Sequence, residues 1–330
     1  MPVPLNKQWF IGVDGGGTST RGVLSDREGQ IRAVVRGDSS NMNSRPLPEV
    51  IHTLKKVCQD LLDQVGGTSE QVQSVFLGLA GAGRPRERDL LLEGLQEAYP
   101  GRVQVDNDAV TALYAGTWGR PGMVLIAGTG SIAYGVSTTG ERYRVGGWGW
   151  LLGDEGSGFI LGQEALRAIL RAFDGRGKET QLTSLVFSLY GIQEATEVVS
   201  FIHASENPRK LMAEVGPLVL QAAEQGDEVA LEIVQQAAQD LVELVVACSR
   251  VMVESLPIVL AGGLLGEGTL LREKVMNQLS DLGYSVEKPS FPPSVGALIM
   301  ALQTGGVTLD RAVKQNMTES WALLGEGVQS

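Results

Sequence analysis

Acidic residues occur at two points where a strand is predicted to end, and at the first of them glycines follow. In FIGVDGGGTST (residues 10–20), Asp14 precedes three glycines and three hydroxyl side chains, with no lysine. In VDND (residues 105–108), two carboxylates stand immediately before the apolar helix pattern AVTALYAG. Glycine amides can approach phosphate oxygens closely, and a carboxylate can hold a divalent cation or accept a proton. These residue types suit phosphoryl transfer.

A second glycine loop, GTGS (residues 128–131), also follows a predicted strand. A P-loop is excluded because the chain contains neither Gly-Lys-Ser nor Gly-Lys-Thr. GTGSIA fits a dinucleotide-binding pattern, but Ile132, Tyr134 and Val136 alternate as a strand instead of opening a helix, which disfavours a Rossmann site. Two hairpin turns that hold phosphate remain, although either alone could be an ordinary tight turn. Without lysine such a site needs a divalent cation, which we expect Asp14 to hold through water.

Three further features each allow a functional and a structural interpretation. Asp108 suits a base that accepts the proton of an attacking hydroxyl, and it also suits a helix N-cap. The glycine-rich segment 146–166, with Asp154 and Glu155, suits a sugar, although Trp148 and Trp150 could be core anchors. LAGGLL (residues 260–265) could pack against a nucleoside base or simply begin a helix with glycine.

The strand pattern that must position these residues occurs twice. Residues 10–35 predict a three-strand meander, and residues 123–147 predict another at an offset of about 113, which places Gly15 on Gly128 and Gly17 on Gly130. Each half continues with alternating helices and strands, and the second half has a long helical region over residues 156–254. We therefore expect an α/β fold of two duplicated domains, each a mixed five-stranded sheet flanked by helices, with a cleft between them. The expected boundaries are 1–117, 118–305 and a tail over 306–330.

Composition narrows the class of partner. The formal net charge of -11 argues against nucleic acid and against anionic membranes. No apolar run reaches a membrane span, and the N-terminus lacks the apolar core of a signal peptide, so we expect a cytoplasmic protein. Cys58 and Cys248 lie on apolar faces of predicted helices and are expected in the core, and the two histidines show no zinc-ligand spacing.

The motifs DGGGTST, LGLAGAGRP, NDA, AGTGS, GGWGWLLGDEGSG and LAGGLL resemble the N-acetylglucosamine kinase branch of the BadF/BadG/BcrA/BcrD ATPase family, in the actin-like ATPase and sugar kinase superfamily. The resemblance runs from about Phe10 to Leu302 and implies ATP, with Mg²⁺ at Asp14, between two ribonuclease H-like domains. It implies that Asp108 takes the proton of the sugar 6-hydroxyl. The implied ATP contacts are Asp14, Gly16, Gly17, Thr18, Thr129, Gly130, Ser131, Gly262 and Gly263. The implied sugar contacts are Asn41, Asp108, Gly147, Asp154 and Gly158.

The resemblance implies an ATP-dependent kinase for an amino sugar, with N-acetylglucosamine as the first expectation. Ala82 stands where the animal enzymes carry a sugar-contacting serine, which leaves glucosamine and N-acetylmuramic acid open. An activator of a 2-hydroxyacyl-CoA dehydratase is disfavoured because Cys58 and Cys248 lie outside the glycine loops. A non-catalytic sugar sensor is a further alternative, which the intact Asp108 disfavours. A homodimer is common in the family.

Overall fold

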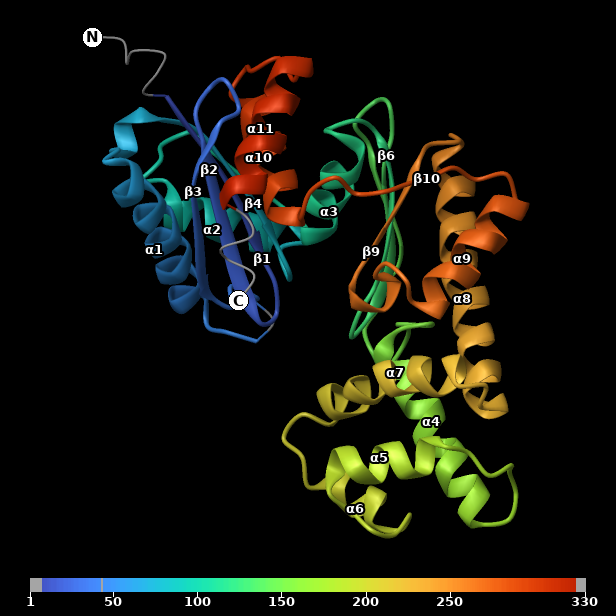
Figure 1. Cartoon of the computed structure of the whole chain (residues 1–330). Helices are drawn as coiled ribbons and strands as arrows, with labels where there is room; N and C mark the ends of the chain where they lie inside the picture. Colours follow the sequence, from blue (N-terminus) through green and yellow to red (C-terminus); the bar gives the residue numbers. More distant parts are fainter. Residues whose placement is uncertain (1–7, 43, 325–330) are drawn as a thin grey trace. The chain divides into compact units, whose positions relative to one another are not determined.

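The computed structural model describes residues 8–42 and 44–324. It contains two mixed five-stranded sheets flanked by helices, which confirms the expected fold class (Figure 1). Contacts group the chain into unit 1 (Met1–Arg120 and Pro289–Ser330) and unit 2 (Pro121–Lys288). The expected domain boundaries stay a prediction. The compact units cut the chain differently because a helix near the C-terminus packs on the first sheet.

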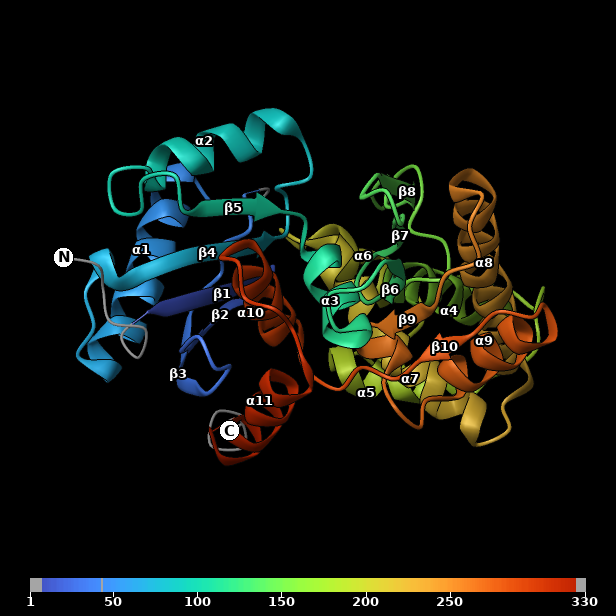
Figure 2. The same ribbon diagram turned by 90° about the horizontal axis from the view of Figure 1, so that it is seen from above.

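The sheet of unit 1 has the order β3-β2-β1-β4-β5, which Figure 2 shows from its β5 edge to its β3 edge. The strand β1 is antiparallel to β2 and parallel to β4, and β5 is parallel to β4. The carboxyl ends of β1, β4 and β5 therefore lie at one edge of the sheet. The strands are β1 (Trp9–Gly15), β2 (Ser19–Ser25), β3 (Ile31–Asp38), β4 (Val72–Leu79) and β5 (Val103–Asp106).

Helices cover both faces of this sheet. Ile11 and Val13 face the apolar side of α1, whereas Gly12 faces α10 so closely that a Cβ there would lie 2.1 Å from the backbone nitrogen of Leu298. Only glycine lets helix and strand backbones approach in this way. The helices of unit 1 are α1 (Leu47–Val65), α2 (Pro85–Leu95), α3 (Asp108–Thr117), α10 (Pro293–Thr304) and α11 (Arg311–Leu324), with a 3₁₀ turn at Ser69–Gln71.

Unit 2 repeats the sheet, with the order β10-β9-β6-β7-β8. The predicted offset does not hold through the turn: Gly15 is still paired with Thr20, whereas Gly128 already lies between the paired residues Ala127 and Ser131. The strands are β6 (Gly122–Ala127), β7 (Ser131–Val136), β8 (Arg142–Gly146), β9 (Ile258–Ala261) and β10 (Val286–Glu287).

The long helical region of unit 2 is confirmed. Gly162 of α4 lets α7 approach closely, since a Cβ there would lie 1.8 Å from the carbonyl oxygen of Met212. Within the unit, α5 and α6 lie beyond α4 and α7, away from the sheet (Figure 1). The helices are α4 (Gly158–Phe173), α5 (Leu182–Tyr190), α6 (Glu197–His203), α7 (Pro208–Glu224), α8 (Glu228–Met252), the 3₁₀ helix η3 (Gly263–Leu265) and α9 (Leu270–Asp281).

Both cysteines are buried, as expected, Cys58 in α1 and Cys248 in α8. The tail contains a helix that its weak pattern did not predict: α11 buries Met317 and contacts β3, and Trp321 lies 5.8 Å from the guanidinium of Arg21. No helix within residues 8–42 and 44–324 is long and apolar enough to cross a membrane.

Candidate functional site

Asp14 and Asp108 approach each other in unit 1 through Thr111. Asp14 is near the end of β1, and Asp108 is the first residue of α3. The hydroxyl of Thr111, fully buried on the first turn of α3, lies 2.8 Å from Oδ1 of Asp14 and 2.7 Å from the carbonyl oxygen of Asp108. Gly78 of β4 makes room for this side chain, because a Cβ there would lie 2.0 Å from its methyl carbon.

Burial dominates the electrostatics of this pair. It raises the pKa of Asp14 to about 7, an effect opposed by the Thr111 hydrogen bond, reinforced by the charge of Asp108 and opposed by Arg21. Burial likewise raises the pKa of Asp108, against hydrogen bonds from backbone amides that lower it. A raised pKa means that each carboxylate binds a proton more readily than an exposed aspartate. Both groups therefore have the character expected of functional carboxylates.

The helix N-cap is Asn107 and not Asp108. The side-chain oxygen of Asn107 accepts a hydrogen bond from the amide of Ala109 at 2.8 Å. The alternative structural role for Asp108 is therefore wrong, because the preceding residue already performs it. The neighbouring loop also reaches this point, since a Cβ on Gly83 would lie 3.6 Å from Nδ2 of Asn107. Ala82 itself is fully buried in the core of unit 1.

The first glycine loop lies at the same edge of the sheet. The amide of Gly16 donates to the carbonyl of Ser19 at 3.0 Å, and Thr18 is exposed in the turn. A Cβ on Gly16 or Gly17 would meet no atom closer than 3.6 Å, and neither residue has a positive φ. The nearest atom to that position on Gly17 is Nδ2 of Asn41. The fold itself therefore does not require glycine at these two positions, and Asn41 lies beside the loop as expected.

The second glycine loop (residues 128–131), which belongs to unit 2, is hydrogen-bonded to residues 154–159. The hydroxyl of Ser131 donates to the carbonyl of Glu155 at 2.6 Å, and its amide donates to Oδ1 of Asp154 at 3.3 Å. The amides of Gly158 and Phe159 donate to the carbonyls of Gly128 and Thr129, at 2.8 and 3.4 Å.

Asp154 is the centre of this arrangement. Its backbone has a φ of 64°, uncommon for a residue other than glycine, and its side chain is buried. Oδ2 accepts a hydrogen bond from Nη2 of Arg209 at 3.1 Å. Burial raises the pKa of Asp154, against hydrogen bonding by Ser131 and the charge of Arg209. The carboxylate expected at a sugar is thus bound to the glycine loop and to α7.

The tryptophan segment is not a core anchor. Trp148 is 67% exposed and packs against the guanidinium of Arg144 at 4.7 Å, while Trp150 is 39% exposed and contacts Phe159 edge-on. Gly147 has a φ of 67°, and a Cβ on it would lie 2.9 Å from the side chain of Ile132. The core-anchor alternative is therefore wrong, and exposed aromatic faces are available to a ligand.

A cavity of about 530 Å³ within unit 2 is lined by two of the predicted ATP contacts, Thr129 and Gly263. The second glycine loop and Gly263 form one part of its wall. Helix α7 forms another part, through residues that the sequence did not suggest: Ala213, Pro217, Leu220, Gln221 and Glu224. Gly158, expected at a sugar, also lines this cavity. Gly262 has a φ of 90° and a Cβ on it would lie 2.3 Å from the carbonyl of Ala127, so the turn itself requires glycine there.

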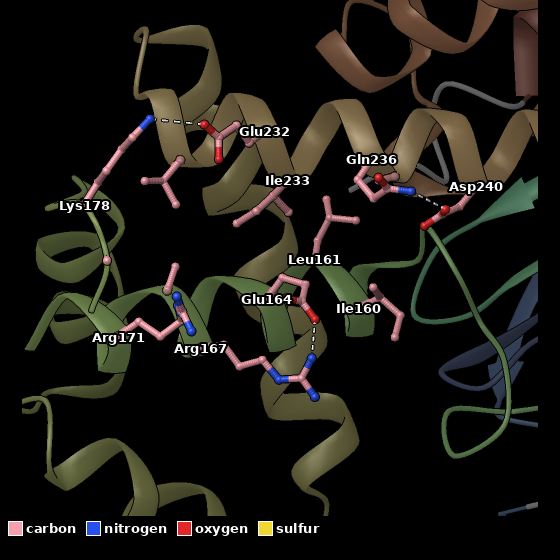
Figure 3. Close-up of a pocket in the computed structure, with 14 residues that line it drawn as sticks. Ile160, Leu161, Glu164, Arg167, Arg171, Lys178, Glu232, Ile233, Gln236 and Asp240 are labelled. Atoms are coloured by element: carbon pink, nitrogen blue, oxygen red, sulfur yellow. Dashed lines mark hydrogen bonds and ion pairs between the residues drawn. The ribbon is translucent and has the colours of Figure 1, made fainter. Parts of the chain in front are cut away.

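Another cavity, of about 650 Å³, lies between α4 and α8 (Figure 3). Ile160, Leu161 and Ile233 give it an apolar lining, and its charged side chains pair locally, as Lys178 does with Glu232 at 3.2 Å. It contains no residue of either glycine loop. The chemistry found above is therefore not located in this cavity.

The sequence and the fold of the chain are both similar to those of known proteins. Residues 11–301 match the sequence model of the BadF/BadG/BcrA/BcrD ATPase family. The chain is 32% identical over 262 residues to a Clostridium acetobutylicum protein named N-acetylmuramic acid/N-acetylglucosamine kinase, covering 78% of this chain and 86% of that one. It is 31% identical over 320 residues to the N-acetyl-D-glucosamine kinase of Dictyostelium discoideum, covering 91% and 99%. A Chromobacterium violaceum structure described as a candidate N-acetylglucosamine kinase superposes with a TM-score of 0.72 at 27% identity, covering 90% and 99%.

Proposed function

Because the chain belongs to the BadF/BadG/BcrA/BcrD ATPase family, we propose that it is an ATP-dependent kinase that phosphorylates the 6-hydroxyl of an amino sugar. The observation that carries this proposal is the pair of half-buried carboxylates, Asp14 and Asp108, joined through Thr111 beside an open glycine loop. The names of both relatives that share over 30% identity include N-acetylglucosamine, one of them together with N-acetylmuramic acid, which supports N-acetylglucosamine as the first substrate.

In the proposed reaction the 6-hydroxyl oxygen attacks the γ-phosphorus of ATP. A new oxygen–phosphorus bond forms, the bond from the γ-phosphorus to the bridging oxygen breaks, and its electron pair leaves with ADP. Asp108 accepts the hydroxyl proton. Its raised pKa supports this role, because burial makes the carboxylate a better proton acceptor than an exposed aspartate. Asn107 supports it too, since it caps α3 and leaves Asp108 for chemistry.

Magnesium fits Asp14 on the chemistry of that group. The carboxylate is partly removed from water, which raises its pKa, and a bound cation would offset the cost of its charge. Among the residues that the structure describes, no group of three or more histidine, cysteine, aspartate or glutamate side chains could hold a metal. This agrees with an ion coordinated mostly by water and phosphate, as Mg²⁺ prefers. When bound, it neutralises charge on the phosphate oxygens.

The cavity of unit 2 suits the nucleoside. Its glycines allow a flat base to approach the backbone, and Gln221, Glu224 and Thr269 supply polar groups at its wall. We propose that each glycine loop binds phosphate oxygens through its backbone amides, and that the exposed tryptophan segment contributes to sugar binding. The expected homodimer and the expected cytoplasmic location stay predictions. Size-exclusion chromatography would test the homodimer.

A coupled assay of ADP release tests the proposal. The purified protein is given MgATP with glucose, glucosamine, N-acetylglucosamine, N-acetylmannosamine or N-acetylmuramic acid. We expect strong stimulation by N-acetylglucosamine, and N-acetylmuramic acid or glucosamine as the leading substrate would revise the sugar only. Stimulation by none of them would refute the kinase.

Asp108→Asn provides the matched variant. It preserves size and the helix start, so ATP binding should remain while turnover falls by about 10² to 10⁴. Turnover comparable with that of the unaltered protein would remove Asp108 as the base.

A further inference from the structure

Arg209 places a positive charge at a glycine loop that has none in its own sequence. It is the second residue of α7, and its Nη2 donates to Asp154 at 3.1 Å. The same nitrogen lies 3.0 Å from the position that a Cβ on Gly130 would take. The guanidinium therefore lies against the second glycine loop, although about 80 residues separate the two in sequence.

The helix carries Arg209 in line with the candidate nucleoside cavity. Ala213, Pro217 and Gln221 line that cavity and follow Arg209 at intervals of four residues. Residues at this spacing share a helix face, and each interval advances about 6 Å along the axis. A nucleoside beside Pro217 and Gln221 would thus have Arg209 near the end of its phosphate chain.

The guanidinium retains capacity to bind. The side chain of Arg209 is 38% exposed, so a ligand can reach it. Its Nε is buried and has no hydrogen-bond partner among the atoms of residues 8–42 and 44–324. Arginine binds phosphate oxygens through paired, charge-assisted hydrogen bonds, which suits a group already held in a fixed orientation by one carboxylate.

We propose that Arg209 binds the phosphate chain of the nucleotide, and that Asp154 holds the guanidinium in place before the nucleotide arrives. The proposal rests on the proposed function, because it assumes an adenine nucleotide in the unit 2 cavity. The positively charged side chain that the glycine loops lack would then come from α7. The position of Arg209 beside Gly130 then belongs to the ligand site, and the ion pair with Asp154 fixes the orientation of the guanidinium.

Binding of adenosine, ADP and ATP to the full chain, measured by calorimetry without sugar, tests this. For Arg209→Met we expect ATP affinity to fall at least about tenfold, while adenosine affinity stays within about twofold, because only the phosphates contact the arginine. Arg209→Lys should recover part of the loss, since it restores the charge without the planar fork. Unchanged ATP affinity in Arg209→Met, or equal losses for adenosine and ATP, would overturn the proposal.

Asp154→Asn separates phosphate binding from mere support of the loop. If Arg209 served only to hold Asp154, this variant would weaken ATP binding as much as Arg209→Met does. We expect a smaller loss, because the arginine keeps its charge. If the unaltered protein and Arg209→Met bind ATP equally well, only the role of Arg209 is refuted. An unaltered protein that binds no adenine nucleotide refutes the proposed function and this inference with it.

Discussion

Replacing Asp14 by asparagine should stabilise the protein without ligands while abolishing the proposed kinase activity. Burial raises the pKa of Asp14 from 3.8 to about 7 in the folded chain. A carboxyl group with a raised pKa favours the folded state at low pH and loses that contribution as pH rises toward the folded pKa. Above pH 7 the folded chain therefore contains a partly desolvated charge that the unfolded chain exposes fully to water, and asparagine removes this charge.

The size of the effect follows from the two pKa values. Each pKa unit corresponds to about 1.36 kcal/mol, so the cost of the ionised Asp14 grows from about 0.6 kcal/mol at pH 4 to about 4 kcal/mol at pH 8. For a unit of this size each kcal/mol shifts the melting temperature by about 2–4 °C. We expect the stabilisation by Asp14→Asn to increase steadily across this pH range.

Thermal unfolding with a chelator and without nucleotide, from pH 4 to pH 8, measures this difference. Thr111→Val is the matched variant, because it removes the hydroxyl that donates to Asp14 and nearly preserves the side-chain shape. Its destabilisation should be larger at pH 8 than at pH 5, since the lost hydrogen bond favours the charged carboxylate. A stabilisation by Asp14→Asn that is equal at pH 5 and pH 8, or a destabilisation at pH 8, would refute the buried-charge reasoning.

Four other variants follow from the geometry of the two units. Gly17→Ala should leave the melting temperature unchanged and weaken ATP binding by about tenfold, whereas Gly12→Ala should destabilise by about 3 kcal/mol or more because its Cβ meets the backbone of α10. Calorimetry and thermal unfolding on both variants check the contrast, which disappears if Gly17→Ala unfolds early. Asn107→Ala should cost about 1 kcal/mol through the lost cap, read from denaturant unfolding, and no loss would contradict the N-cap assignment. Ser131→Ala should cost about 1 kcal/mol by the same measurement, because its hydroxyl holds Glu155, and a variant of unchanged stability would argue against that role.

The meanders and the first carboxylate site could be predicted because their signals are local. Alternation of apolar residues marks β1 and β2, and the glycines mark the turn between them. The meeting of Asp14 and Asp108 also follows from topology, since the carboxyl ends of β1 and β5 lie at one edge of the sheet. The bridging Thr111 needs more than topology. Its place depends on Gly78 in another strand, which no local pattern of α3 reveals.

The contribution of α7 could not be predicted for a different reason. Its apolar pattern predicts a helix but not the element against which it packs. A partial signal was present, because Gly158 and Gly162 occupy one face of α4 and allow α7 to approach. Only the packed structure shows that this approach brings Ala213 to the cavity and Arg209 to Asp154.

The glycines of the motifs differ in how much room the chain leaves for a side chain at each position. Gly262 is required by the fold, since its φ is 90° and a Cβ on it would lie 2.3 Å from the carbonyl oxygen of Ala127, whereas a Cβ on Gly130 would meet only the side-chain ends of Asp154 and Arg209. Gly17 and Gly263 meet no such obstruction from the chain itself, and neither has a positive φ. A side chain at these positions would project into space that the protein leaves open. Glycine at these positions suits a ligand that approaches the backbone, so the support for the proposed nucleotide site comes from the unobstructed glycines and not from the motif as a whole.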